Sequence, residues 1–289
     1  MIHSVTRRRL LIGLPLLAGF SVTPTSWAGA SSLANVEQRH GGRLGVFALD
    51  TGSGRTLAWR ADERFLMCST FKGLLAGQIL ARVDAGQEQL DRLVPYTEHD
   101  LIFTSPVTQV NVTHGALPVG TLLDAILEQS DNTAAVLLMR SAGGPAGLTE
   151  FVRQLGDNVT RSDRYEPESN NTNGVLDTTS PRAIVTTAQR LLLDDVLGPS
   201  SRAILEQGMV NCKPGLNRLR AALPDGWQGA DRPGTSIEKE TNDYLLARPP
   251  GAAPLLIAAY YDAPGKPLAE REAVLREVGG LFVQWATAF

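Results

Sequence analysis

Cysteine and histidine are both scarce in this sequence of 289 residues. The two cysteines, Cys68 and Cys212, are too few for a disulfide framework, even in an oxidising compartment. One of the four histidines lies at the extreme N-terminus, and His40, His99 and His114 do not stand at metal-ligand spacing. The composition therefore argues against a zinc hydrolase and against a Ser-His-Asp triad, and we expect neither a metal nor a cofactor.

An excess of positive charge is also missing. The chain has 27 lysines and arginines against 30 acidic residues, a net charge of −3, and no basic patch of the kind that binds nucleic acid. Hydrophobic residues make up 43% and charged residues 20%, the balance of an ordinary globular enzyme. The length suits one large domain, or two interleaved layers, with a sizeable core.

A membrane-spanning apolar run is missing as well. Near the N-terminus Arg7–Arg9 precede Leu10–Phe20, a mostly apolar stretch too short to cross a bilayer, and small residues follow up to Ala30. This pattern predicts an export signal over residues 1–30, cleaved after Ala28 or Ala30, and the paired arginines suit the twin-arginine route. An uncleaved membrane anchor is the alternative. Without the signal the chain keeps 24 basic and 30 acidic residues, a net charge of −6, and we expect a periplasmic protein with no membrane attachment.

The first chemical motif is Cys68–Lys72, which the apolar run Gly73–Leu80 follows. The pattern predicts a helix from Ser69 to about Ala85, in which Lys72 shares a face with the serine. A lysine that is held close and kept partly neutral can take the serine's proton, and the positive end of the helix dipole would lower its pKa. The backbone N–H of Ser69 would be free to bind an oxyanion. By itself the motif fits a serine cap and a solvated lysine just as well.

A second polar motif, Ser130–Asn132, precedes an apolar helix predicted over residues 133–139. The apolar character of that helix predicts burial, which would place the three polar residues at the edge of a cavity. Helix capping explains one of the three, since Ser, Asp and Asn are all favoured caps. The motif alone leaves both interpretations open.

A polar segment from Arg164 to Pro181 has no amphipathic pattern and is predicted to be a surface loop. Arg164 and Asp177 have opposite charges and could clamp its two ends. Glu166 and Asn170 are four residues apart, so a short helical turn would point both at one water. A carboxylate beside a water and a serine ester is a general base for hydrolysis, although a single loop glutamate is ordinarily just solvated.

Strand patterns occur at both ends of the chain. Alternating apolar residues and turn signals predict a hairpin near the N-terminus and three further strands near the C-terminus, which together make a five-stranded antiparallel sheet. The predicted strands are 43–49, 55–59, 229–236, 243–247 and 255–261, and the predicted helices besides those above are 32–39, 121–129, 181–193, 199–210 and 268–286.

Together the motifs resemble the class A serine β-lactamases, within the penicillin-recognising serine enzymes. The Ser-x-x-Lys motif at Ser69, the Ser-Asp-Asn motif at Ser130 and the Glu-Pro-Glu-x-Asn motif at Glu166 stand in the family's order and spacing. The resemblance implies an α/β fold in which helices flank the five-stranded antiparallel sheet and an all-helical lobe stands beside it. It implies one domain over residues 31–289, with the α/β lobe at about 31–65 and 212–289, the helical lobe at about 66–211, and the active site between them.

The resemblance also implies catalytic roles. Ser69 would attack the β-lactam carbonyl and form an acyl-enzyme, and Lys72 and Glu166, the latter through a water, would share the acylation proton. Ser130 would pass a proton to the leaving nitrogen. Glu166 and Asn170 would position and activate the deacylating water. The implied function is hydrolysis of penicillins and cephalosporins, and hence antibiotic resistance, by a monomer.

Substrate-binding residues are implied in the same way. Asn132 would bind the amide of the substrate's side chain, and the N–H groups of Ser69 and Thr235 would hold the oxyanion. Arg218 matches the place where some members keep an arginine for the substrate carboxylate. The strand 229–236 would supply the remaining contacts through Arg232, Gly234, Thr235 and Ser236.

One segment departs from the family pattern. The family's fourth motif is Lys-Thr-Gly or Lys-Ser-Gly, and this chain reads Arg232-Pro233-Gly234. Arginine keeps the charge but changes the hydrogen-bonding geometry, and proline loses both a hydroxyl for the substrate carboxylate and a backbone donor. Since the backbone of position 233 points to the same side as that of Thr235, toward the cleft, proline breaks no ladder bond there. We expect the strand to form and kcat/KM to fall roughly ten- to hundredfold, or to shift between substrates.

Three further expectations concern alternatives. Some members bridge a cysteine at the position of Cys68 to one at the position of Ser236, and the serine excludes that bridge here. With Cys212 in a different segment, both thiols are expected to be free, and carbapenem hydrolysis gains little support. A cell-wall D-Ala-D-Ala peptidase is one other function, although it does not need Glu166 and Asn170. A β-lactam-binding or slowly acylating protein that does not hydrolyse is the other, because of Arg232 and its neighbouring proline.

Overall fold

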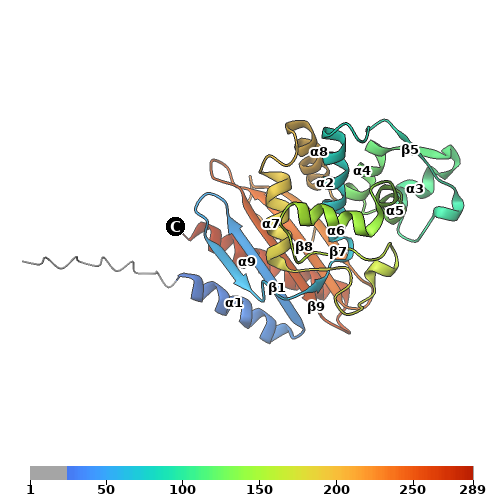
Figure 1. Ribbon diagram of the computed structural model, residues 1–289. Coiled ribbons are helices and arrows are strands. Elements are labelled where there is room, and N and C mark those ends of the chain that lie inside the picture. Colours follow the sequence, from blue (N-terminus) through green and yellow to red (C-terminus); the bar gives the residue numbers. More distant parts are fainter. Residues whose placement is uncertain (1–24, 289) are drawn as a thin grey trace, which may run out of the picture.

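The computed structural model describes residues 25–288, and Figure 1 shows a central sheet with helices on both faces. Residues 1–24, and with them most of the predicted export signal, lie outside the described residues. The first helix, α1 (Thr25–His40), begins earlier than the predicted range 32–39. Between residues 25 and 288, no helix combines the length and apolarity that a membrane span requires.

The sheet is five-stranded and antiparallel, as predicted, in the order β2-β1-β9-β8-β7. Its strands are β1 (Arg43–Asp50), β2 (Thr56–Trp59), β7 (Gln228–Thr235), β8 (Glu240–Arg248) and β9 (Leu255–Asp262). The apolar β9 is central and buried on both faces, whereas the polar β7 is an edge strand. An edge is where a strand tolerates proline, and β7 continues through Pro233 opposite Asp243.

The remaining elements pack on the two faces of this sheet or stand beside it (Figure 1). They are β3 (Phe65–Leu66), α2 (Phe71–Asp84), β4 (Leu93–Pro95), α3 (Pro106–Val110), β5 (Ala116–Pro118), α4 (Val119–Glu128), α5 (Asn132–Ser141), α6 (Gly144–Gln154), β6 (Thr178–Thr179), α7 (Pro181–Leu192), α8 (Pro199–Val210) and α9 (Leu268–Thr287). Short 3-10 turns include η1 (Cys68–Thr70) and η4 (Glu168–Asn170). No sequence pattern had indicated the helix α6.

Two hydrophobic clusters hold the layers together. One lies between the sheet and the terminal helices α1 and α9, around residues such as Val36 and Phe282. The other joins the opposite face of the sheet to α2, α4, α5 and α7. Every residue of α2 from Phe71 to Leu80 is buried. Any polar side chain on that stretch, Lys72 above all, is therefore removed from bulk water by the packing of its neighbours.

Candidate active site

Ser69 lies in the 3-10 turn η1, immediately before α2, rather than at the first position of the helix. Side chains of the sheet strands β8 and β9 hold this turn and the residues before it by hydrogen bonds. The Thr70 hydroxyl is 2.9 Å from the Tyr260 hydroxyl and donates to the Met67 carbonyl at 2.8 Å. Asn242 donates to the Leu66 carbonyl at 2.8 Å. These bonds fix the turn, and with it the position of the Ser69 hydroxyl at the wall of a cavity.

Lys72 is completely buried and donates three hydrogen bonds. Its Nζ is 2.7 Å from the Ser130 carbonyl oxygen, 3.2 Å from Ser130 Oγ and 2.5 Å from Asn132 Oδ1. Glu166 Oε1 lies 3.7 Å away. In the described part of the chain no hydrogen bond joins Lys72 to the Ser69 hydroxyl, which the sequence had placed within its reach. Three acceptors match the three donors of a charged ammonium group.

Burial lowers the pKa of Lys72 to about 8, with a smaller contribution from the charge of Arg232 and an opposing one from Glu166. The predicted direction is correct, but the main cause is desolvation rather than the helix terminus. Burial also raises the pKa of Glu166, while Lys72 opposes that rise. The two groups therefore form a buried pair in which each limits the other's shift.

In the Ser130–Asn132 motif the middle residue caps a helix, and the two residues beside it face the site. Asp131 is the cap of α5: it accepts from Ala134 N at 2.8 Å and from Val107 N at 2.9 Å. Ser130 adopts a positive φ of 61°, uncommon for a residue with a side chain, and its carbonyl and hydroxyl both face Lys72. Because one aspartate suffices as the cap, the neighbouring serine and asparagine are available to the site.

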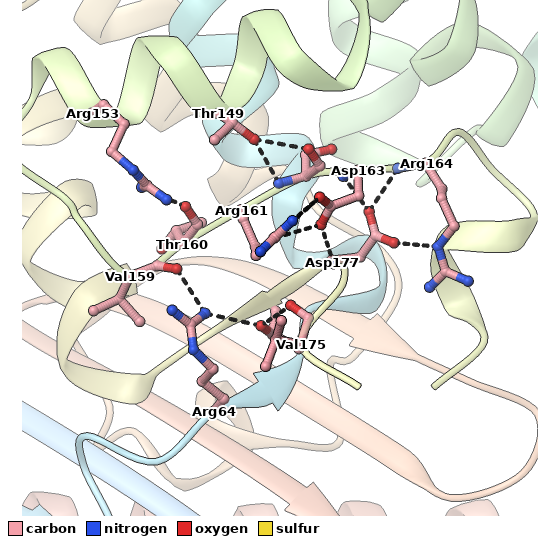
Figure 2. Close-up of polar contacts among 12 residues, drawn as sticks. Arg64, Thr149, Arg153, Val159, Thr160, Arg161, Asp163, Arg164, Val175 and Asp177 are labelled. Atoms are coloured by element: carbon pink, nitrogen blue, oxygen red, sulfur yellow. Dashed lines mark hydrogen bonds and ion pairs between the residues drawn. The ribbon is translucent and has the colours of Figure 1, made fainter. Parts of the chain in front are cut away.

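Glu166 and Asn170 face each other across one turn of the polar loop, and Asn170 Nδ2 donates to Glu166 Oε2. The predicted clamp closes the ends of this loop (Figure 2): Arg164 Nε donates to Asp177 Oδ2 at 2.6 Å. Asp177 Oδ1 also accepts from the backbone N–H groups of Asp163 and Arg164, at 2.7 and 3.0 Å. The loop is thus folded back on itself, with Glu166 directed at Lys72.

The edge strand β7 forms the opposite wall. Ser236 N donates to the Glu240 carbonyl at 3.0 Å, so the alternation of an antiparallel ladder turns the backbone of Pro233 and Thr235 away from β8, toward the cleft. Gly234 lets the strand approach the nucleophile closely. A Cβ there would lie 2.6 Å from the Met67 carbonyl oxygen and 3.0 Å from Ser69 N.

Comparison with known proteins agrees with this geometry. A family model described as the β-lactamase enzyme family matches residues 29–286. The chain is 40% identical over 271 residues to the carbapenem-hydrolyzing β-lactamase KPC of Klebsiella oxytoca, covering 93% of this chain and 92% of that protein. A solved class A β-lactamase, the ancestral protein GNCA, is 48% identical, with a TM-score of 0.87 over 90% of this chain and 100% of that one. The chain belongs to the class A β-lactamases.

A solved β-lactamase from Burkholderia vietnamiensis is more similar still in sequence. It is 73% identical, with a TM-score of 0.89, over 90% of this chain and 97% of that one. The expected α/β fold and the expected enzyme class are therefore confirmed.

Two arginines of this class A β-lactamase are bound to the protein itself. Arg232 is fully buried and donates to the carbonyl oxygens of Ile126 and Leu127, at 3.0 and 2.7 Å. Arg218 Nη2 donates to Thr235 Oγ1 at 2.6 Å, and its Nη1 donates to the Gly234 carbonyl at 3.0 Å. Arg218 thus fixes the end of β7 that carries Thr235, a role that the sequence did not reveal.

Ser236 also has a partner within the protein. Its hydroxyl donates to the Glu240 carboxylate and accepts from the backbone N–H groups of Lys239 and Glu240, at 3.2 and 3.0 Å. It lines the cavity, but these bonds use its donor and its lone pairs. Ser236, which was expected to bind substrate directly, is therefore hydrogen-bonded within the turn that joins β7 to β8.

The cavity between these walls has a volume of about 370 Å³. The expected residues Ser69, Ser130, Asn132, Asn170, Arg232, Gly234, Thr235 and Ser236 line it. The sequence did not single out seven other lining residues: Phe103, Thr104, Gln129, Pro214, Ile237, Leu268 and Arg271. Phe103 is 56% and Ile237 89% exposed, and no motif marks an exposed apolar side chain before the fold is known. Cys68 and Cys212 are both free and buried.

Proposed function

We propose that this β-lactamase opens the β-lactam ring of penicillins and cephalosporins through an acyl-enzyme on Ser69, and so confers resistance to them. One observation carries the proposal. Completely buried Lys72 is bonded to Ser130 and Asn132 and lies 3.7 Å from Glu166, just behind the turn that carries the serine. A buried charge with this many partners is a functional arrangement rather than a solvated lysine.

In acylation Glu166 would act as the general base. All three donors of Lys72 are used, and a pKa of about 8 keeps it mostly charged at pH 7, so it has no free lone pair for the Ser69 proton. Glu166 would accept that proton through a water. Lys72 would stabilise the developing charges, and Ser130, in contact with it, would deliver a proton to the leaving nitrogen. The N–H groups of Ser69 and Thr235 would bind the oxyanion.

Deacylation supports a lactamase over the two alternatives. Asn170 donates to Glu166, so both side chains can hold a water against the acyl-enzyme. A peptidase acting on cell-wall peptides has no need for this pair. A protein that only binds β-lactams has no need for a clamped loop that directs a buried carboxylate at Lys72.

The substrate would bind between the two walls of the cavity. Asn132 would bind the side-chain amide. The positive charge of Arg218, behind β7, and that of Arg232, which lies on β7 and lines the cavity, would attract the substrate carboxylate. Ser236 would shape the wall instead of donating to the substrate. Pro233 supplies no hydroxyl, so we expect Pro233→Thr to lower KM for benzylpenicillin and to raise kcat/KM about tenfold. An unchanged kcat/KM would show that the proline costs nothing.

The test is hydrolysis of benzylpenicillin and of a chromogenic cephalosporin by the mature protein, with mass spectrometry of the reaction mixture. Ser69→Ala is the control for background hydrolysis. Turnover without a lasting adduct supports the proposal, and a stable adduct on Ser69 supports the slowly acylating binder. If the protein shows no turnover and forms no adduct, both the lactamase and the slowly acylating binder are refuted. Because the KPC relative is named for carbapenem hydrolysis, a carbapenem is assayed alongside.

We also propose that the chain is exported to the periplasm by the twin-arginine route and acts there as a monomer of one domain, residues 31–289, with lobes at about 31–65 plus 212–289 and 66–211. The basis is the signal pattern of residues 1–30. N-terminal sequencing of the periplasmic protein should begin after Ala28 or Ala30, and lysines in place of Arg7 and Arg8 should abolish export. Light scattering should give the mass of one chain.

A further inference from the structure

Glu240, at the start of β8, has a buried carboxylate that joins two segments of the active-site wall. The residue is only 2% exposed. Oε1 accepts from the Thr172 hydroxyl at 2.8 Å, across 68 positions of sequence. Oε2 accepts from the Ser236 hydroxyl. One side chain therefore connects the loop that carries Glu166 with the turn that follows β7.

The chemistry of this bridge calls for a carboxylate. A carboxylate accepts on both oxygens and donates from neither, so two hydroxyl groups can approach it from opposite sides. Its charge is compensated locally, because Lys239 Nζ lies 3.4 Å from Oε1. Arg271 fixes the backbone of the same residue by donating to its carbonyl oxygen at 3.1 Å. A buried carboxylate with these partners is held in one position.

The bridge lies in the exposed part of the loop, where Arg164 Nη2 also donates to the Asn171 carbonyl oxygen at 2.7 Å. The Arg164–Asp177 clamp holds the two ends of the loop, but residues 171–175 are exposed. Thr172 is two residues from Asn170, which positions Glu166. A second cavity of about 550 Å³ separates this part of the loop from the turn 235–240. The bond from Thr172 to Glu240 crosses between the two walls of that cavity.

We propose that Glu240 is a positioning residue that fastens the tip of the Glu166 loop to the β7–β8 turn. The inference rests on the proposed lactamase activity and deepens it. Fastening keeps Asn170 aligned with Glu166 for deacylation, and it closes the side of the cleft toward which a bulky β-lactam side chain would extend. We call Thr172, Glu240 and Ser236 together the latch. It favours rapid deacylation and restricts the entry of β-lactams with bulky side chains.

The first experiment needs no substrate. Thr172→Val removes the hydroxyl at nearly constant shape, on an exposed residue outside the core, and Thr172→Ser is the matched control that keeps the hydroxyl. Hydrogen exchange of the amides in residues 168–173 should accelerate about tenfold in the valine variant and stay at the wild-type rate in the serine variant. Because Thr172 is exposed, this is the lower end of the range expected for one hydrogen bond to a charged group. Equal exchange in all three proteins would overturn the latch, even if the protein proved to have no lactamase activity.

The second experiment measures function with benzylpenicillin and with ceftazidime, a cephalosporin with a bulky side chain. In Thr172→Val we expect kcat for benzylpenicillin to fall about fivefold, with more acyl-enzyme at steady state, and KM for ceftazidime to fall about threefold. Thr172→Ser should match the wild type. A protein that is merely less stable would not split kcat from KM in this way.

A double variant tests whether Glu240 is the partner. If the latch is a single unit, Thr172→Val should add no further change to Glu240→Ala in kcat or KM. Additive effects would overturn the proposal, since Thr172 would then act through another group. If Glu240→Ala fails to fold, the valine and serine variants at 172 still decide between the outcomes. If the wild type does not hydrolyse benzylpenicillin, the proposed function fails and the exchange experiment judges the latch alone.

Discussion

The clamp at the base of the Glu166 loop provides a sharp test of how the site is held. Asp177→Asn keeps the shape of the side chain and suits the positive φ of 54° at this position, which asparagine tolerates well. The amide oxygen can still accept from Asp163 N and Arg164 N. The amide nitrogen, however, replaces Oδ2, which accepts from Arg164 Nε at 2.6 Å. Two donors would then face each other.

The size of the effect follows from burial. Asp177 is 3% and Arg164 22% exposed at the side chain, so the guanidinium cannot turn fully into water to replace its lost partner. A hydrogen bond between charged groups contributes about 1.5–3 kcal/mol, and leaving one buried partner unpaired brings the cost toward the upper value. A cost of about 3 kcal/mol corresponds to a rise of roughly a hundredfold in the population of the open loop.

Limited proteolysis measures that population, because cleavage of a transiently opened loop follows its opening equilibrium when opening is fast. The cleavage rate within residues 165–176 should rise roughly a hundredfold in Asp177→Asn. The matched control is Asp62→Asn. Asp62 pairs with Arg182 at 2.7 Å but is 73% exposed, so its loss should cost less than about 1 kcal/mol. Equal cleavage of the two variants would refute the argument that burial gives the clamp its strength.

Three shorter predictions concern other residues of the active site. Glu166→Gln should slow deacylation by about 10²–10⁴, so that mass spectrometry finds an acyl adduct of benzylpenicillin on Ser69, and rapid turnover would contradict its role as base. Since burial raises the pKa of Glu166 above 4.5, kcat/KM should fall as the pH drops through that raised value. Because the pKa of Lys72 is about 8, kcat/KM should also fall above pH 8. A rise of kcat/KM there would instead make the neutral lysine the base. Gly234→Ala should lower kcat/KM for both penicillins and cephalosporins at least tenfold, because its Cβ would lie 2.6 Å from the Met67 carbonyl, and wild-type kinetics would show that the strand can move.

The strands of the sheet could be predicted from local sequence patterns. Alternation and turn residues predicted all five strands, since each strand's pattern reflects its own two faces. The helix α6 was missed, and α2 begins two residues later than the predicted start at Ser69. A 3-10 turn and an α-helical first turn bring side chains to similar places from the same residues, so only the folded backbone separates them.

Within the site, the sequence by itself determined which chemical groups are present and their order. It also indicated two pairs: Glu166 with Asn170, because a spacing of four residues puts both on one side of a short turn, and Arg164 with Asp177, because opposite charges stand at the two ends of one loop. Spacing also placed the missing donor of Pro233 toward the cleft, since backbone direction alternates along any strand.

Tertiary structure decided everything that depends on what surrounds a group. The pKa of Lys72 is set by burial in α2, and burial is a sum over neighbours from the whole chain. Arg218 and Ser236 were expected to contact substrate, yet packing gives both of them partners inside the protein. Thr172 and Glu240 are 68 residues apart and carry no shared motif. Their bond exists because the loop and the sheet edge are brought together, and no local spacing encodes that meeting.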